Sequence, residues 1–235
     1  MNDVFLRTEM LLGREAMETL ARSHVAVFGL GGVGSWAAEA LIRTGVGKLT
    51  LVDHDTVGLS NLNRQVQATL DTLDTPKAIA LAQRFARLNP DCQVTPLVGK
   101  YESASRETFL GEYDYILDCI DLVSCKQDLI RTSLARSVPI LSALGTGNKL
   151  DPTLLRVSDL SQTEGCPLAR IVRKELRAVG ILHHKVVWSP EPARETTQGE
   201  PPPPGRRSVP ASVVWVPASA GLLMAATCVD DLTRK

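Results

Sequence analysis

Short runs of β-branched and other apolar residues alternate along this chain with longer segments of helical periodicity. HVAVFG, which ends at Gly29, is the first such run; an alanine-rich segment follows it up to Gly45, and KLTLVD comes next. A short β-branched run predicts a strand, whereas apolar residues three and four positions apart predict a helix. Together these segments predict one strand–helix–strand crossover unit.

The alternation continues through the middle of the chain. A helical segment beginning at Pro76 leads to CQVTPLV, where Pro96 indicates a strand end or an edge strand, and YDYILDCID and VPILSAL flank a further helical segment. This order predicts an α/β fold with a doubly wound, mostly parallel sheet and a Rossmann-like nucleotide-binding half. Ligands of such sheets bind at the carboxyl ends of the strands, so we expect the functional site there.

We expect a single domain over residues 1–235, with a leading helical segment (1–23), a Rossmann-like core (24–147) and a C-terminal elaboration (148–235). Residues 189–207 are rich in proline and charge and lack apolar periodicity, which predicts a mobile loop, either a linker or a substrate-binding flap. The apolar run from Val213 to Val229 is shorter than the ~20 residues that span a bilayer. We therefore expect a buried helix there and no membrane partner.

Charge and cysteine content narrow the class of protein. Basic and acidic residues are balanced at 26 each, so no net field attracts DNA or a membrane, and any RNA contact must come from a local patch. The five cysteines are scattered and form no C-x-x-C pair, which argues against a disulfide framework and a zinc clasp. The N-terminus is charged and lacks the apolar segment of a secretory signal, so the sequence predicts a cytoplasmic location.

One local patch of basic residues falls on a helix predicted from Cys166 to Gly180. Its basic residues at helical spacing are Arg170, Arg173, Lys174 and Arg177. This spacing predicts one charged face, which either contacts RNA phosphates or is simply solvated.

Cysteine and histidine side chains near this helix could have a chemical role or a purely structural one. Cys166 before Pro167 is either a nucleophile activated by the helix dipole or, as we favour, a small cap residue. His183 and His184 lack a matching cluster of metal ligands, so we expect them at the surface.

A glycine-rich loop lies between the first predicted strand and the first predicted helix. Gly29, Gly31 and Gly34 form the pattern G-x-G-x-x-G, with Gly32 beside them. Glycines permit close backbone approach, and a helix N-terminus attracts an anion. Asp53 ends the second predicted strand, where a carboxylate accepts hydrogen bonds from ribose hydroxyls. These features alone suit a nicotinamide-dependent oxidoreductase and an ATP-binding protein equally.

The polar residues that follow favour a triphosphate. They are Asn61, Asn63, Arg64 and Gln65 in the loop VGLSNLNRQ, Lys77 at the start of the next helix, and Asp121 after a later strand. A pyrophosphate is usually served by backbone N–H groups, whereas a triphosphate calls for added cations, which Arg64 and Lys77 supply. Asp121 suits Mg²⁺ bound to phosphate oxygens. An oxidoreductase leaves these three side chains without a task.

Several motifs together resemble the ubiquitin-activating-enzyme-like superfamily, whose members bind ATP and activate a carboxylate. They are GLGGVGS, LVDHDTVGLSNLNRQ, TPKA and LDCID. Within that superfamily, RTEMLLG, SNLNRQ, GTGNKLDPT and CPLARIVRKELR resemble the tRNA threonylcarbamoyladenosine dehydratase branch. This resemblance covers nearly the whole chain.

The resemblance implies a role for each candidate residue. The nucleotide would be held by Gly29, Gly31, Gly32, Gly34, Asp53 and Asp55, its phosphates by Asn61, Arg64, Gln65 and Lys77, and Mg²⁺ by Asp121. Relatives that activate sulfur carriers place an arginine of the leading helix in the partner subunit's site. Met10 stands at that place here, so Arg7, one turn earlier, is the candidate for catalysis across a homodimer.

The implied reaction is the ATP-dependent dehydration of threonylcarbamoyladenosine next to the tRNA anticodon. The free carboxylate is activated at phosphorus and then captured within the same molecule to close a ring, with Arg64, Lys77 and Asp121 as catalytic residues. The alternative is an adenylyltransferase for the C-terminal glycine of a ubiquitin-like sulfur carrier, with that carrier or a cysteine desulfurase as partner. A regulatory module that binds ATP without turnover is a further alternative.

Overall fold

Seven strands form one sheet in the order β3-β2-β1-β4-β5-β7-β6 in this computed structural model, which describes residues 3–197 and 209–234. The strands are β1 (His24–Phe28), β2 (Lys48–Asp53), β3 (Gln93–Val98), β4 (Tyr115–Asp118), β5 (Ile140–Ala143), β6 (Arg156–Asp159) and β7 (Lys185–Trp188). Neighbours are parallel except β6 and β7, which pair antiparallel. The predicted doubly wound, mostly parallel sheet is confirmed, and Pro96 lies on an edge strand as expected.

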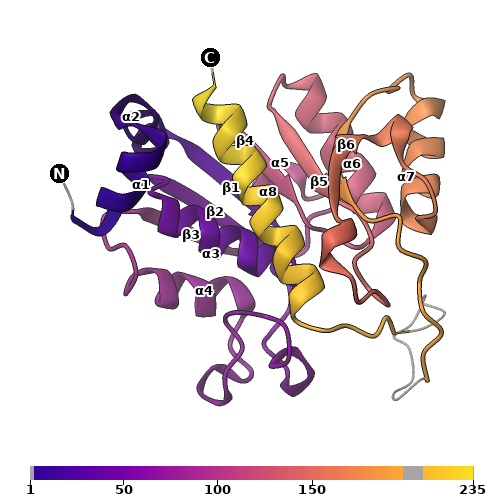
Figure 1. Ribbon diagram of the computed structural model, residues 1–235, viewed down its shortest axis with the longest axis horizontal. Helices are drawn as coiled ribbons and strands as arrows, with labels where there is room; N and C mark the ends of the chain where they lie inside the picture. The colour runs from indigo at the N-terminus through magenta and orange to yellow at the C-terminus, as the bar shows by residue number, and fades with distance from the viewer. Residues whose placement is uncertain (1–2, 198–208, 235) are drawn as a thin grey trace.

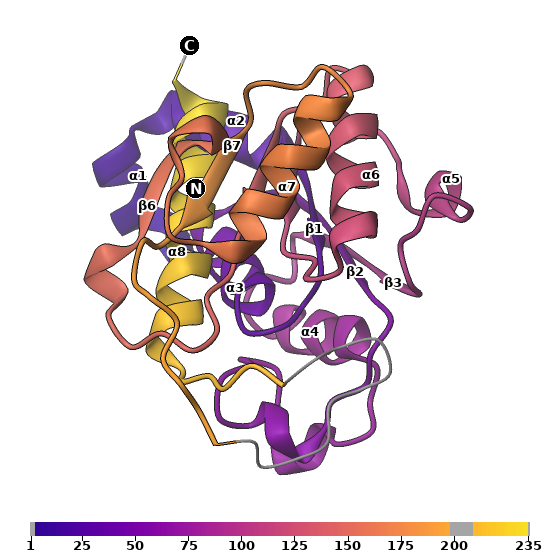
Figure 2. The same cartoon turned by 90° about the vertical axis from the view of Figure 1, so that its right-hand side faces the viewer.

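Helices cover both faces of this sheet. On one face lie α2 (Arg14–Arg22), α3 (Gly34–Thr44), α4 (Lys77–Phe85) and α8 (Trp215–Thr233), with α8 crossing in front of the sheet in Figure 1. On the other lie α5 (Arg106–Phe109), α6 (Val123–Ala135) and α7 (Pro167–Ala178), as Figure 2 shows. α1 (Leu6–Leu12) precedes α2, and short 3-10 helices occur at Asp3–Phe5, Leu59–Asn61, Leu70–Thr72, Pro152–Leu154 and Leu160–Gln162.

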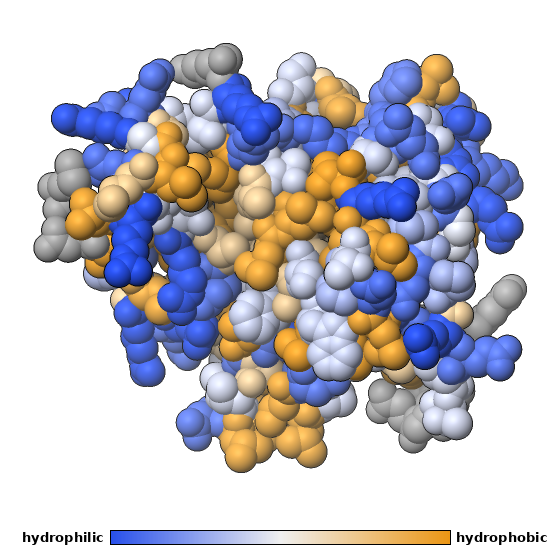
Figure 3. Space-filling view, in the orientation of Figure 1, coloured by the Kyte–Doolittle hydropathy of each residue, from blue (hydrophilic) through white to orange (hydrophobic). Residues whose placement is uncertain are grey.

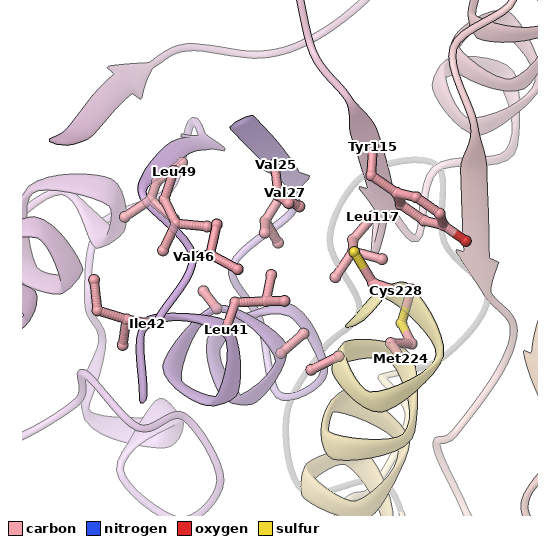
Figure 4. Packing of buried hydrophobic residues seen from close by; sticks show 14 of the residues in the cluster. Val25, Val27, Leu41, Ile42, Val46, Leu49, Tyr115, Leu117, Met224 and Cys228 are labelled. Carbon is pink, nitrogen blue, oxygen red and sulfur yellow. The ribbon is translucent and has the colours of Figure 1, made fainter. Parts of the chain in front are cut away.

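Alternate residues of β1 enter two separate hydrophobic clusters. Val25 and Val27 face α3 and α8 and belong to the same cluster as Met224 (Figure 4). Ala26 and Phe28 belong to the cluster on the opposite face, together with residues of α6 and α7. Successive side chains of a strand point to opposite faces, so a strand that is apolar at every position is buried on both.

The apolar C-terminal segment forms α8, which is buried along one face, whereas Trp215 and Leu222 are about half exposed, so the buried helix expected from the sequence is confirmed only for that face. Val216, Ala220 and Met224 have no exposed surface. Near the end of the helix, Asp231 accepts hydrogen bonds from the Tyr115 hydroxyl of β4 (2.6 Å) and the Lys185 ammonium of β7 (2.7 Å). None of the helices in the described part of the chain combines the length and hydropathy that a bilayer crossing requires.

The leading segment contains a break that its helical periodicity did not reveal. It forms two helices, α1 and α2, which meet at Gly13. Gly13 has a φ of 85°, which a residue with a side chain rarely adopts, and its N–H bonds to the carbonyl of Glu9. The chain therefore changes direction between the two short helices.

The proline-rich loop expected at residues 189–207 begins in a fixed position. Ser189 is fully buried, and the Lys149 ammonium donates hydrogen bonds to the backbone carbonyls of Ser189 (3.0 Å) and Glu191. The Glu191 carboxylate accepts the N–H groups of Leu150 and Asp151. Residues 198–207 lie outside the described residues, so the mobility expected of them stays a prediction.

A fully buried ion pair marks the carboxyl end of β4. The Lys126 ammonium of α6 lies 2.6 Å from a carboxylate oxygen of Asp118, and neither side chain has any exposed surface. The other carboxylate oxygen accepts the N–H of Ile120 at 3.1 Å. Taking two charges out of water is costly, and removing one partner leaves the other charge buried and unpaired. The pair therefore holds the turn after β4 in place, and Asp121 lies in that turn.

Lys126→Met should lower the free energy of unfolding by about 3–5 kcal/mol, because the Asp118 carboxylate would stay buried without its cation. Urea denaturation followed by circular dichroism measures this loss. The double variant Asp118→Asn, Lys126→Met should recover most of it, since no charge is left buried. Arg14→Ala, which breaks an exposed pair with Glu18, is the control and should cost less than about 1 kcal/mol. A similarly small loss for Lys126→Met would contradict this account.

Candidate active site

The glycine loop connects β1 to α3 at the carboxyl edge of the sheet. A Cβ at Gly34 would lie 1.8 Å from the carbonyl oxygen of Gly29, so only glycine fits there. A Cβ at Gly31 would meet no atom within 4 Å, which means that the outer side of the loop is open. The N-cap residue of α3 is Val33, whose side chain cannot satisfy the first N–H groups of the helix. The loop therefore presents backbone N–H groups and the positive end of a helix to an anion.

Asp53 connects the end of β2 to this loop. Its side chain is almost fully buried, one oxygen accepts the N–H of Leu30 at 2.6 Å, and the other accepts the N–H of Asp55 at 2.8 Å. A carboxylate oxygen has more than one lone pair, so Asp53 can also accept hydrogen bonds from ribose hydroxyls. The structure thus places Asp53 beside the glycine loop, as the sequence predicted.

Gln67 is a loop residue that the sequence analysis missed. Its side chain is 2% exposed, and its Nε2 donates to the carbonyl of Leu30 at 2.8 Å. Among the described residues, its Oε1 has no hydrogen-bond partner. Gln67 follows the SNLNRQ motif by two residues, and only its buried contact with the glycine loop distinguishes it from an ordinary polar loop residue.

Arg64 lies against the glycine loop. Its Cδ is 3.5 Å from where a Cβ at Gly32 would be, and its backbone carbonyl accepts the indole N–H of Trp36 at 3.0 Å. One guanidinium nitrogen donates to the carbonyl of Ser60 (2.8 Å) and to the side-chain oxygen of Asn63 (2.9 Å). Arg64 is therefore the cation placed next to the predicted phosphate-binding backbone.

Lys77 and Asp55 form an ion pair just after the carboxyl end of β2. The Lys77 side chain is 7% exposed, and its ammonium lies 2.8 Å from a carboxylate oxygen of Asp55, which is 53% exposed. The backbone carbonyl of Asp55 also accepts the N–H of Lys77. Asp55, expected from the sequence to touch the nucleotide, thus orients Lys77.

Asn61 and Gln65 shape the loop that carries Arg64. The side-chain oxygen of Asn61 accepts the N–H of Gly58 at 3.1 Å, and its backbone carbonyl accepts the N–H groups of Arg64 and Gln65. The Gln65 side chain is almost fully buried. Asn61 therefore holds the backbone of the loop in its fold, and the side-chain oxygen of Gln65 accepts a hydrogen bond from the Nε2 of Gln67 at 3.3 Å.

Asp121 is exposed in the turn after β4, whereas Asp118 is buried on the far side and pairs with Lys126. A second group of candidate cation ligands lies after β2, where Asp53, His54 and Asp55 offer ligand atoms within 4.8 Å of one another. Both positions are at the carboxyl edge of the sheet, and Mg²⁺ needs only one or two carboxylates when it also binds phosphate oxygens. The donor set at this edge thus suits a magnesium–triphosphate complex.

Arg7 lies at the other end of α3 from the glycine loop. Phe5, two residues before it, packs near Gly45, which ends α3. A helix of 11 residues is about 16 Å long, so Arg7 does not join the other candidate residues within one chain. A surface hollow lined by Arg22, His24 and Lys48 also lies at this amino edge, away from the candidate site.

Only three of the four basic residues of α7 lie on the one charged face that the sequence predicted. Arg173 turns inward, and its guanidinium donates to the backbone carbonyls of Leu160 (3.3 Å) and Thr163 (2.7 Å). Arg170, Lys174 and Arg177 are exposed at positions that share a helix face. The exposed basic face therefore has three members.

Cys166 and His184 both have structural roles. Cys166 is the N-cap of α7, and its sulfur accepts the N–H of Ala169 at 3.5 Å, which agrees with the favoured cap interpretation. The surface position expected of His184 is wrong: the ring is buried and lies 2.8 Å from the Ser142 hydroxyl. Burial, and secondarily the Lys126 charge, lowers the pKa of His184 to about 4. His183 is exposed as expected.

Comparison with known proteins identifies the family. A match to the ThiF family extends over residues 5–230. The tRNA threonylcarbamoyladenosine dehydratase of Bacillus subtilis (strain 168) is 39% identical over 98% of this chain and 94% of that protein. The Escherichia coli (strain K12) sulfur carrier protein ThiS adenylyltransferase is 37% identical, over 58% of this chain and 55% of its own length.

A solved structure is similar over nearly the same extent. The crystal structure of E. coli tRNA N6-threonylcarbamoyladenosine dehydratase in complex with ATP superposes with a TM-score of 0.86 at 33% identity, covering 97% of this chain and 93% of that chain. The chain therefore belongs to the ThiF family and is a homologue of the tRNA threonylcarbamoyladenosine dehydratases over nearly its whole length.

Proposed function

We propose that the protein is an ATP-dependent tRNA threonylcarbamoyladenosine dehydratase. The observation that carries this proposal is the similarity to the B. subtilis dehydratase over 98% of the chain, which includes the C-terminal elaboration as well as the nucleotide-binding half. The similarity to the sulfur-carrier adenylyltransferase extends over only 58% of the chain. Activation of a sulfur carrier is therefore the second candidate.

The nucleotide site follows from the glycine loop and its neighbours. The E. coli relative was crystallised with ATP, and the geometry here suits the same ligand. In this proposal Asp53 holds the ribose, the backbone between Gly29 and Gly34 receives the phosphates, and Arg64 and Lys77 neutralise their charge. Asp121 would hold Mg²⁺, which when bound stabilises negative charge on phosphate oxygens.

The proposed chemistry starts from a carboxylate, which is a poor electrophile until one of its oxygens becomes a leaving group. An oxygen of the threonylcarbamoyl carboxylate attacks a phosphorus of ATP and forms a mixed anhydride. The P–O bond to the rest of the phosphate chain breaks, and pyrophosphate (attack at the α-phosphorus) or ADP (attack at the γ-phosphorus) leaves. A group of the same substrate then attacks the activated carbonyl carbon, closes the ring and releases that oxygen on the phosphorus product. Arg64 and Lys77 stabilise the charge that develops on the phosphates in both steps. Because the nucleophile belongs to the substrate, Cys166 is free to serve as a helix cap.

The exposed face of α7 is the surface that we propose for tRNA. Arg170, Lys174 and Arg177 occupy one side of this helix. Its first turn lies next to the carboxyl edge of the sheet, since the Cys166 sulfur is 3.8 Å from where a Cβ at Gly145, after β5, would be. The whole chain has no net charge, so such a local patch has to supply the attraction to phosphates. The five cysteines are all free thiols, which agrees with a proposed cytoplasmic location.

A homodimer is the third part of the proposal. Large apolar side chains are exposed on α1, where Met10 and Leu11 are 79% and 85% exposed, and on α8, where Trp215 and Leu222 are 48% and 49% exposed. Figure 3 shows apolar surface gathered over these elements on one side of the molecule. Exposed apolar patches of this kind mark association surfaces. A second copy is also what would bring an Arg7 to the site of its partner.

Arg64→Ala and Asp121→Ala should each slow the dehydration of tRNA by at least about 100-fold, because each removes a charge that stabilises the transition state. The protein is incubated with ATP, Mg²⁺ and tRNA that carries threonylcarbamoyladenosine. The tRNA is then digested gently, and mass spectrometry of the nucleoside detects the loss of one water. Arg87→Ala, an exposed arginine beyond α4, is the control and should leave the rate unchanged. ATP binding without any loss of water in the unsubstituted protein would refute the dehydratase assignment.

Replacing Arg170, Lys174 and Arg177 together with alanine should weaken tRNA binding about tenfold or more at ~0.1 M salt. The negative slope of log K against log salt should also become shallower by about 1–3, since each lost phosphate contact contributes roughly 0.7–0.9 to its magnitude. Filter binding over a salt series gives both quantities, and the affinity for ATP should stay constant. An unchanged slope would show that this face is only solvated.

Light scattering at micromolar concentration should give twice the chain mass of 25.4 kDa. Leu11→Asp and Leu222→Asp should each shift the protein toward the monomer, because a carboxylate cannot be buried unpaired in an interface. Glu18→Asp on the neighbouring helix is the control. A monomer at micromolar concentration without any substitution would remove the dimer from the account.

A further inference from the structure

Two segments far apart in the sequence meet at Asn148, which follows β5. Asn148 has a φ of 59°, and its backbone carbonyl accepts the N–H of Arg194 at 2.8 Å. Its own N–H donates to the carbonyl of Ala211 at 2.8 Å, and its side-chain oxygen accepts the N–H of Ala211 at 2.7 Å. Ala211 is thus held by two hydrogen bonds to one residue. We call residues 209–212 the entry segment, because they lead into α8.

Gly147 allows the entry segment to come this close. A Cβ at Gly147 would lie 2.7 Å from the Cβ of Pro210, a separation that real Cβ atoms do not reach. Gly147 and Asn148 both belong to the GTGNKLDPT segment. Gly147 and Asn148 have no role in the proposed chemistry, but both are needed for the close contact with residues 210 and 211.

Asn63 connects the entry segment to Arg64. Its side-chain Nδ2 donates to the carbonyl of Ser212 at 3.1 Å, while its Oδ1 accepts a hydrogen bond from the Arg64 guanidinium at 2.9 Å. Using both ends at once requires a carboxamide, since a carboxylate has no donor and an alkyl chain has neither group. The bonds to Asn63 and to the carbonyl of Ser60 come from the same guanidinium nitrogen, so together they fix the plane of the guanidinium group.

We propose that Asn63 is a positioning residue that orients Arg64 toward the β- and γ-phosphates of ATP, and that Asn148 supports it by holding the entry segment. This inference rests on the proposed role of Arg64 as a phosphate ligand. A long side chain loses conformational freedom when it engages a ligand, so an arginine held in place beforehand binds phosphate more tightly. The contacts run in sequence from Asn148 through Ala211 and Ser212 to Asn63 and Arg64.

The test compares two nucleotides that differ only in the phosphates beyond the first. Isothermal titration calorimetry measures the dissociation constants of ATP and of AMP for the purified full-length protein. Asn63→Ala should weaken ATP binding about tenfold and leave AMP binding unchanged, because the base, ribose and first phosphate do not depend on Arg64. Asn148→Gly should weaken ATP binding about threefold, since glycine keeps the backbone bonds and the positive φ but removes the side-chain oxygen.

Ser137→Gly is the matched control for Asn148→Gly. Ser137 also has a positive φ, 56°, but lies after α6 at the opposite edge of the sheet. Its replacement should leave the affinity for both nucleotides unchanged. Thermal melting of each variant shows whether the fold is retained, and an equal weakening of ATP and AMP binding would indicate general damage and overturn the positioning role.

Arg64→Ala separates this inference from the proposed function. If Arg64→Ala weakens ATP binding but Asn63→Ala does not, Arg64 is a phosphate ligand and Asn63 does not position it. If Arg64→Ala leaves ATP binding unchanged, the proposed role of Arg64 itself fails. The double variant Asn63→Ala, Arg64→Ala should bind ATP no more weakly than Arg64→Ala alone; a further loss would show that Asn63 acts on ATP by another route.

Discussion

The buried pair of Asp118 and Lys126 fixes the point where the sheet, the glycine loop and the turn with Asp121 meet. Asp118 ends β4, and the next residue, Cys119, packs against both Gly29 and Gly34. The carboxylate also holds the N–H of Ile120, which sets the course of the chain toward Asp121. If this turn moved, the glycine loop would lose the surface on which it rests. Burying two charges costs free energy, which is offset only when both charged groups find partners. The contacts of Asp118 with Lys126 and with the N–H of Ile120 therefore stabilise the fold and also position the turn that carries Asp121.

The candidate site forms because several loops leave the same edge of a parallel sheet. β1 leads into the glycine loop, β2 supplies Asp53, and the long loop after β2 returns with Arg64 before Lys77 starts α4. Short polar contacts join these loops: the N–H of Leu30 donates to Asp53 at 2.6 Å, and the ammonium of Lys77 donates to Asp55 at 2.8 Å. The C-terminal elaboration reaches the same edge through Asn148 and the entry segment. The site thus depends on both halves of the chain.

Much of this arrangement could be predicted because its causes are local. Strand and helix periodicity gave the order of elements, and the strand ends placed Asp53 and the glycine loop together. The break at Gly13 was missed, because helical spacing of apolar residues continues across it. Gln67, Asn148 and Glu191 were missed for another reason: their partners lie 37 or more positions away, and no periodic pattern marks them. The inward turn of Arg173 and the burial of His184 likewise depend on contacts that form only in the folded chain.

The central claim is that the protein joins a substrate carboxylate to phosphorus, and isotope tracing tests it most directly. The tRNA is prepared with ¹⁸O in the carboxylate of threonylcarbamoyladenosine, and the phosphorus products of ATP are examined by mass spectrometry after the reaction. The account predicts one ¹⁸O atom per turnover in AMP or in phosphate, with the ring-closed nucleoside retaining the other. Label that appears only in water, with none in any phosphorus product, would contradict carboxylate activation.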